Sequence, residues 1–438
     1  MDKVRQFIHS IWYYVLVIAV TVIFHSLSLG IVGLGVLALL ISAVLIVDDD
    51  FAPVMVTMGA CVYVLNEYPI TDIYYIVFGA CLALVLPSIA YFIYKNIKKG
   101  VRFSLGKYFL PLVLIVVAYS LGGIFSPYYN IGSFGFGVVI SVVVLCCYLL
   151  LYNFNKSSFK DLAFHLISVV SIIIILEMWV DYFTSGDILA LMQNKGVRVG
   201  VGEINLPAMT IGMWIPLLLA KGLNNKKDYL YVLTAVFALL NVVFTFSRGA
   251  LLFTLIFGLV SLIIFYIKTE KKKNVSITVG SVLVVGAVLF AIFYSNIIGM
   301  LMHYIERGFD DTGRFELYQL AIQYFSEYPI FGVGWQVDTY SFIFSQFHST
   351  PLQFLASMGV VGFLLMVPHY YQRYSTFLTK PNVYSMFLLM SVLICEGYGF
   401  IDQTCTFSMS YIYIIIFMLA SDDKRLNTMN EKEKINTQ

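Results

Sequence analysis

The chain has 438 residues, of which 60% are hydrophobic and only 12% are charged, and its formal net charge is +2. A soluble chain carries about 25% charged residues, so the composition excludes a soluble globular protein, and the small net charge gives no indication of a nucleic-acid partner. Six cysteines without a CxxC pair or a Cys/His cluster support neither a disulfide framework nor a zinc site, and neither a metal nor another cofactor is predicted.

Long apolar runs begin near the N-terminus and recur to the end of the chain. A helix needs roughly 20 such residues to cross a bilayer, and fourteen runs reach or approach that length. The runs are 10–26, 30–47, 51–66, 73–94, 107–125, 134–152, 161–184, 204–220, 229–246, 249–267, 276–297, 353–372, 383–401 and 406–420. Because two of them are short, the sequence predicts an all-α integral membrane protein, a polytopic bundle of about 12–14 transmembrane helices.

Positive charge is distributed unequally between the two sides that these spans define. With the N-terminus in the cytoplasm, 22 of the 27 lysines and arginines fall on the cytoplasmic side, as the positive-inside rule expects. We therefore predict a multi-pass protein of the cytoplasmic (inner) membrane with both termini in the cytoplasm, including a polar tail at 421–438. The five outward exceptions are Lys195, Arg198, Arg248, Arg307 and Arg314.

Four of these five exceptions are arginines, although the cytoplasmic set is mostly lysine. Lysine is sufficient as a topological anchor, whereas a planar guanidinium can hold a phosphate or a carboxylate with two parallel hydrogen bonds. The outer arginines therefore favour an anionic ligand. Pairing with the many acidic residues predicted on the same side is the alternative.

Residues 1–190 contain no candidate site and are predicted to be a transmembrane scaffold. The candidates lie in 191–420, whose one long extracytoplasmic loop, 298–352, has the apolar spacing of an amphipathic helix over 313–326. Arg314 falls in the first turn of that helix, where its charge opposes the helix dipole. A residue placed against its local preference indicates another task.

Further candidates lie near or within the spans of this region. FGVGW, directly after the amphipathic helix, is predicted to be a tight glycine bend, with a phosphate-cradling loop as the alternative. Arg198 and Asn205 precede one span, and Glu396 lies within a later one, where a charge is either functional or the partner of an arginine. His348 stands at a span entrance, as an interfacial residue or as a general base that titrates near neutral pH.

Four blocks between residues 195 and 370 resemble one family. RVGVGEINLPA is similar to its R-x-x-G … N-x-x-A segment, and SRGALL to its S-R-G/A segment between two spans. GRFELYQLAIQYFSEYPIFGVGWQ resembles its G-R-x-x-x-W/Y … P-h-x-G-x-G block, where h is apolar. HSTPLQFLASMGVVGFLL resembles its H-N-x-x-L-x-x-L-x-x-x-G-h-h-G block, with Ser349 where the family has asparagine. In order and spacing, these blocks resemble the O-antigen ligase and Wzy-type O-antigen and capsular polysaccharide polymerase superfamily.

The resemblance implies an integral-membrane glycosyltransferase of the GT-C type with an extracytoplasmic active site. Its donor would be a glycan on undecaprenyl diphosphate, its acceptor a sugar hydroxyl, and its reaction inverting and independent of a metal ion. Fixed arginines would neutralise the leaving diphosphate, and the histidine would take the proton of the acceptor. Catalytic roles then fall to His348, Arg314 and Arg248, and substrate-binding roles to Arg198, Asn205, Arg307 and Glu396.

Polymerases and ligases share these blocks and differ in the acceptor. A polymerase extends another lipid-linked repeat unit to make O-antigen, capsule or exopolysaccharide, whereas a ligase transfers finished glycan to a surface acceptor. Richness in Ile, Lys, Asn, Phe and Tyr suggests an AT-rich genome, and a Gram-positive source would have no lipid A acceptor, so we favour a polymerase. A lipid-linked oligosaccharide transporter is the alternative from another class. Expected partners are the lipid-linked glycan, the bilayer, and a flippase and a chain-length regulator of the same pathway.

Overall fold

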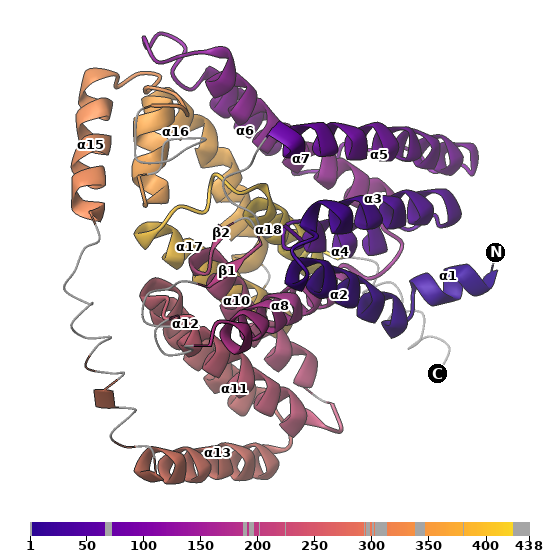
Figure 1. The fold of residues 1–438 in the computed structure, drawn as a ribbon, viewed down its shortest axis with the longest axis vertical. Helices are drawn as coiled ribbons and strands as arrows, with labels where there is room; N and C mark the ends of the chain where they lie inside the picture. Colours follow the sequence, from indigo (N-terminus) through magenta and orange to yellow (C-terminus); the bar gives the residue numbers. More distant parts are fainter. Residues whose placement is uncertain are drawn as a thin grey trace. The chain divides into compact units, whose positions relative to one another are not determined.

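The computed structural model describes residues 2–65, 72–186, 191, 197–200, 202–223, 225–292, 294, 298–299, 302, 313–337, 347–379 and 381–423 (Figure 1). Its helices are α1 (Asp2–Ile8), α2 (Ile11–Ser26), α3 (Gly30–Val47), α4 (Ala52–Cys61), α5 (Asp72–Lys98), α6 (Phe109–Leu121), α7 (Ile131–Phe154), α8 (Phe159–Thr184), α10 (Asn205–Gly222), α11 (Asp228–Phe244), α12 (Arg248–Lys268), α13 (Lys272–Ile292), α15 (Arg314–Glu327), α16 (Thr350–Leu378), α17 (Val383–Ile401) and α18 (Ser408–Ser421). Two short strands, β1 (Arg198–Val199) and β2 (Gly202–Glu203), pair antiparallel. The predicted all-α fold class is confirmed, and α15 covers the helix expected at 313–326.

Among the residues that the structure describes, eight helices are long and apolar enough to cross a membrane, or nine if the bent pair α1 and α2 forms one span. Four shorter apolar helices, α4, α6, α11 and α18, occupy further predicted spans, and the 18-residue α10 occupies another. The protein is therefore a polytopic helical membrane protein. The total of 12–14 spans stays a prediction, because the shorter helices fall below the roughly 20 residues of an ordinary span.

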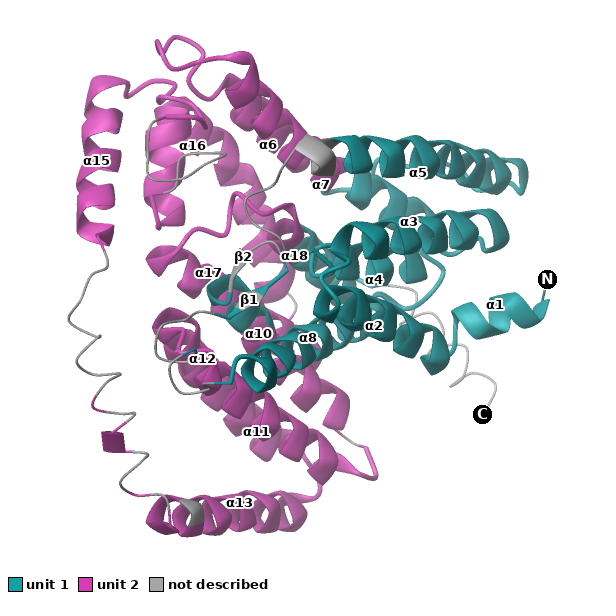
Figure 2. Ribbon diagram, in the orientation of Figure 1, with its two compact units in different colours: residues 1–109, 146–210, 412–438 teal, residues 110–145, 211–411 magenta. Residues whose placement is uncertain are grey.

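The chain divides into two compact units (Figure 2). Unit 1 consists of Met1–Phe109, Cys146–Thr210 and Ile412–Gln438, and unit 2 of Leu110–Leu145 and Ile211–Tyr411. These units are divisions of packing. The predicted boundary between a scaffold and a catalytic region at residue 190 concerns function, and it stays a prediction.

The core of unit 1 is built around α8, which packs against α2 and α4, while α3 packs against α2, α4 and α5. The apolar run in α8 buries several leucine, isoleucine and valine side chains completely, as expected for a helix surrounded by others. Ser158 caps this helix, since its hydroxyl accepts a hydrogen bond from the amide of Lys160 at 3.2 Å. The hairpin strand β1 lies against α8.

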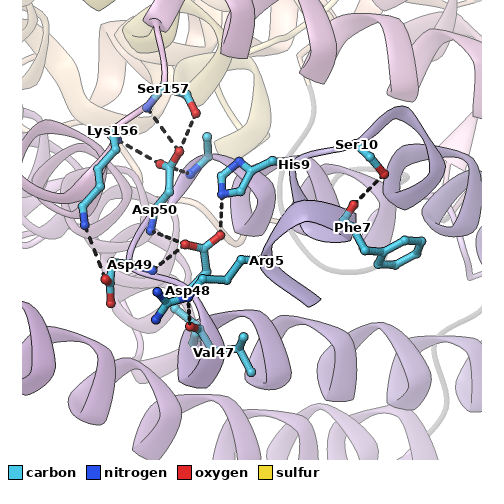
Figure 3. A network of polar contacts seen from close by, with 12 residues as sticks. Arg5, Phe7, His9, Ser10, Val47, Asp48, Asp49, Asp50, Lys156 and Ser157 are labelled. Carbon is cyan, nitrogen blue, oxygen red and sulfur yellow. Dashed lines mark hydrogen bonds and ion pairs between the residues drawn. The ribbon is translucent and has the colours of Figure 1, made fainter. Parts of the chain in front are cut away.

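An acidic triplet, Asp48–Asp50, follows α3 and is buried; we call it the acidic knot (Figure 3). Asp50 accepts hydrogen bonds from the backbone amides of Lys156 and Ser157, at 2.9 and 3.2 Å. Burial would raise the pKa of Asp49, but the surrounding lysines outweigh it and lower that pKa to about 2. The lysines and their distances to the Asp49 carboxylate are Lys95 at 3.2 Å, Lys99 at 2.5 Å and Lys156 at 3.6 Å.

In unit 2, α17 packs against both α12 and α16, and α15 packs against α16. An apolar core joins α15, the segment that follows it and the start of α16. Its buried members are Ala321, Tyr324, Val333, Val337, Phe347 and Ala356. This core fixes α15 against the start of α16, which His348 precedes by two residues.

The helix α16 is interrupted at Gly359, whose φ of 63° and ψ of −165° are not helical. Residues 329–334 fill the break: two of their amides donate to carbonyls before it, at 2.8 and 3.0 Å, and two amides after it donate back to them, at 2.8 and 3.0 Å. The pairs are Val333 with Ala356, Gly334 with Ser357, Val360 with Pro329, and Val361 with Ile330. The backbone groups freed by the break are thus satisfied within the protein, as membrane depth requires.

Glycine is required on both sides of this contact. A Cβ on Gly359 would lie 2.5 Å from the carbonyl of Ile330, and one on Gly332 would lie 2.5 Å from the carbonyl of Ala356. We call this contact of 329–334 with the break at Gly359 the glycine clasp. The amides of Val333 and Gly334 are already used in it, so the alternative of a phosphate-cradling loop gains no support, and the glycines of FGVGW serve close backbone approach.

Candidate active site

Asp402 directly follows α17, and side chains from three elements converge on its carboxylate. Its own amide donates to the carbonyl of Tyr398 at 2.9 Å and ends the helix. Oδ2 accepts a hydrogen bond from the Tyr398 hydroxyl at 2.9 Å, and Oδ1 lies 2.9 Å from Nδ1 of His348. A guanidinium nitrogen of Arg314 lies 3.9 Å from Oδ2. Two of the residues predicted from the sequence therefore meet at a carboxylate.

The charge state of Asp402 determines which ring nitrogen of His348 faces it with a proton. Burial of the Asp402 side chain, which is 14% exposed, would raise its pKa, but the contact with His348 and the charge of Arg314 outweigh this effect and lower it. Because the carboxylate is charged and only accepts hydrogen bonds, we assign the Nδ1 proton of His348 to this contact. In the neutral imidazole Nε2 then carries the lone pair, and the His348 side chain is 29% exposed.

The start of α12 lies at the same place. Its first residue is Arg248, and a Cβ on the next residue, Gly249, would lie 3.4 Å from Ile401 and 3.5 Å from Tyr398. These are ordinary van der Waals distances, so the first turn of α12 touches the last turn of α17. Arg248, the first residue of α12, therefore lies close to the C-terminal end of α17, which Asp402 follows.

Three helix N-termini, those of α12, α15 and α16, therefore meet at the C-terminal end of α17. Their N-cap residues are Ser247, Gly313 and Ser349; neither serine side chain makes a capping hydrogen bond, and the glycine has no side chain. Each N-terminus carries a partial positive charge of about half an elementary charge. The arrangement is one that attracts an anion.

Local sequence explains why the helices begin there. Gly313 takes the left-handed φ of 75° that glycine adopts without strain, and Pro351 lies in the first turn of α16, where its missing amide is not needed. Between α11 and α12 the chain turns within three residues, with Phe246 at a φ of 54°. Arg248 therefore stands directly after a short connection between two helices, as expected for a segment between two spans.

Substrate-binding roles are also predicted for Arg198, Asn205 and Arg307. Arg198 lies in β1 and Asn205 is the first residue of α10, both in unit 1, and their roles stay predictions. Arg307 lies outside the described residues.

Glu396 forms an ion pair with Arg373, a buried arginine of α16 that is 1% exposed. Arg373 also lies 2.6 Å from Nε2 of His369 and over the ring of Tyr370. Glu396 precedes Asp402 by six residues, about 9 Å along α17 at the usual helical rise. Its partner is thus an arginine that the charge count assigned to the cytoplasmic side, and its contact with substrate stays a prediction.

Asp402 itself is absent from the residues predicted from the sequence. The signal was present in LICEGYGFID, since Asp402 directly follows a predicted span and falls on the same predicted side as His348. The sequence alone does not single out Asp402, because many acidic residues share that side and Glu396 is the charge inside a span. Only the fold distinguishes Asp402, which contacts His348, from Glu396, which neutralises the buried Arg373.

Comparison with known families agrees with the resemblance. Residues 233–367 match the family model described as O-antigen ligase. The matched range contains Arg248, Arg314 and His348 and ends before Asp402. A search of curated proteins finds no match. The resemblance is therefore confirmed over this range, and it supports a membrane protein with a function of the glycan ligase or polymerase type.

Proposed function

We propose that this protein transfers a glycan from undecaprenyl diphosphate to the hydroxyl of a sugar on another lipid-linked repeat unit, and so polymerises a surface polysaccharide. The observation that carries the proposal is the contact of His348 with Asp402 at 2.9 Å, beside Arg314 and at the convergence of three helix N-termini. We place the reaction at the outer face of the cytoplasmic membrane, where the lipid tail of the donor stays in the bilayer.

In this reaction His348 acts as the general base. Its Nε2 takes the proton of the acceptor hydroxyl as that oxygen forms a bond to the anomeric carbon. The bond from the anomeric carbon to the phosphate oxygen breaks, its electron pair leaves with the diphosphate, and the anomeric centre is inverted. Asp402 holds the imidazole in the required tautomer and stabilises the imidazolium that forms.

Positive charge at the site stabilises the leaving diphosphate without a metal ion. Arg248 and Arg314 are the first residues of α12 and α15, so each adds a charge to a helix end that is already positive. Such a placement is unfavourable alone and becomes favourable when an anion binds between the helix ends. Arg198 and Arg307 are proposed as further contacts to the donor.

A ligase is the second candidate, because the matching family model is described as O-antigen ligase. The chemistry at the anomeric carbon is the same, and only the acceptor differs. The interruption of α16 is a feature that a transporter would share. Its freed backbone groups bond to residues 329–334 of the same chain, however, so the break needs no transport role to explain it.

The test uses the purified protein and undecaprenyl-diphosphate-linked oligosaccharides extracted from the source cells, with and without a metal chelator. A ladder of longer lipid-linked products, unaffected by the chelator, supports the polymerase. A single addition to a surface acceptor without a ladder supports the ligase. Movement of the lipid-linked glycan across proteoliposomes without any new glycosidic bond would reject both.

A further inference from the structure

Tyr318 lies one helical turn after Arg314 in α15, and its hydroxyl reaches two other elements. It donates to the carbonyl of His348 at 3.2 Å and to the carbonyl of Ile401 at 3.4 Å. A phenol has one proton, so the two carbonyls share it or receive it in turn. This one side chain links α15 to His348, two residues before α16, and to Ile401, the last residue of α17.

The backbone of His348 is held in an uncommon conformation. Its φ is +47°, in the left-handed region that few residues other than glycine adopt. Such a conformation persists at a functional site only when the surrounding contacts enforce it. For His348 the contacts are the Asp402 carboxylate at the ring and the Tyr318 hydroxyl at the carbonyl. The neighbouring amide of Phe347 is held as well, by Oε1 of Gln353 at 3.0 Å.

We propose that Tyr318 is a positioning residue for the general base. Its hydroxyl fixes the strained peptide of His348, so that Nδ1 stays against Asp402 and Nε2 stays directed to the acceptor. Because Tyr318 and Arg314 share one helical face, the same contact sets the base relative to the arginine that receives the diphosphate. The inference rests on the proposed function of His348 and adds a residue that does not touch the substrate.

The first test is Tyr318→Phe, which removes one hydroxyl and keeps the ring. We expect kcat for glycan extension to fall by about 10-fold to 100-fold, the range that a misplaced catalytic group produces. KM for the lipid-linked donor and the melting temperature should stay near the wild-type values, because binding and packing are kept. Wild-type kcat in Tyr318→Phe would overturn the proposal.

The matched control is Tyr328→Phe, the same chemical change directly after α15. The Tyr328 hydroxyl makes no hydrogen bond to the residues that the structure describes, and its ring packs against Tyr128. We expect this variant to keep wild-type kcat. An equal loss in both variants would show that the effect belongs to tyrosine packing in general and not to the contact with His348.

A double variant separates positioning from an independent effect. In the His348→Ala background, Tyr318→Phe should not lower the residual rate further, because the group it positions is gone. An equal drop in both backgrounds would contradict the inference. If wild type itself makes no product, the proposed function fails. A structure of Tyr318→Phe then decides the inference alone: a φ of His348 that stays positive, with Nδ1 still against Asp402, overturns it.

Discussion

Asp402 in unit 2 and Asp49 in unit 1 are both carboxylates just past the end of a helix, and their side chains are similarly buried, at 14% and 11% exposed. In both cases the hydrogen bonds and charges of neighbouring side chains lower the pKa of the carboxylate against the effect of burial. Three lysines surround Asp49. Asp402 has Tyr398 from the helix that it follows, Arg314 from α15 and His348 from the segment before α16.

The two clusters differ in how many hydrogen-bonding groups of the partner side chains remain unused. Among the described residues, Nε2 of His348 has no partner, and the guanidinium of Arg314 has only the 3.9 Å contact to Asp402. In the acidic knot, by contrast, the Asp50 carboxylate accepts hydrogen bonds from the backbone amides of Lys156 and Ser157. Charges that neutralise one another stabilise a fold, whereas a cluster whose members keep unused donors and acceptors toward a common point can bind and react.

The largest effect expected is the contrast between Asp402→Asn and Asp49→Asn. Loss of the negative charge at 402 removes the group that fixes the tautomer and stabilises imidazolium, so turnover should fall by about 10²-fold to 10⁴-fold, as for a lost general base. The melting temperature should change little. Asp49→Asn should lower the melting temperature and leave turnover per folded molecule unchanged, and the opposite assignment of the two effects would break the comparison.

Arg314→Lys should lower turnover by about 10²-fold to 10³-fold, the loss measured when one donor to a developing negative charge is removed. Lysine keeps the charge but lacks the planar fork for two phosphate oxygens. Arg248→Lys should be impaired for the same reason. The control is Arg102→Lys, an exposed arginine of unit 1, which should behave as wild type. Wild-type rates of glycan extension in Arg314→Lys would contradict the role of the fork.

Gly359→Ala should destabilise the protein by roughly 1–3 kcal/mol, since alanine is strained at this φ and ψ and its Cβ would press on Ile330. Detergent-solubilised protein should melt at a lower temperature. The matched control is Gly280→Ala in α13, where an added Cβ meets nothing within 4 Å. Equal melting temperatures for the two variants would show that the glycine clasp is not required.

The smallest effect concerns acid stability. The pKa of Asp49 is lowered from its usual value to about 2 in the folded protein, so its contribution to stability is complete above about pH 4. It should be lost as the pH falls from about 4 toward 2. Melting temperature measured across that window should fall less steeply in Asp49→Asn than in wild type. Identical slopes would mean that the lysines around Asp49 do not stabilise its charged form.

The sequence was sufficient for the parts of this protein that depend on local pattern. Hydropathy predicted an all-helical membrane protein, and apolar spacing predicted α15. The position of Arg248 between two spans followed from the same patterns. These inferences need only neighbouring residues, and the structure brings the ends of α12, α15 and α16 together as a shared site requires.

Contacts between distant parts of the chain could not be obtained in this way. The pairing of Asp402 with His348 joins residues 54 positions apart, and that of Glu396 with Arg373 joins two helices. Glu396 lies in a predicted span and Asp402 directly follows it, and the residues beside them in the sequence do not indicate which side chain each one contacts. The glycine clasp could not be predicted from the sequence either, because the need for each glycine comes from a backbone segment that is distant in the sequence.

The central claim is that Arg248, Arg314 and His348 form one site for a lipid diphosphate and its acceptor. The most direct measurement is a structure of the His348→Ala variant with the undecaprenyl-diphosphate-linked oligosaccharide bound. We expect the diphosphate at the N-termini of α12, α15 and α16, in contact with both arginines. A diphosphate held elsewhere, for example by the lysines around Asp49, with neither arginine in contact, would contradict the central claim.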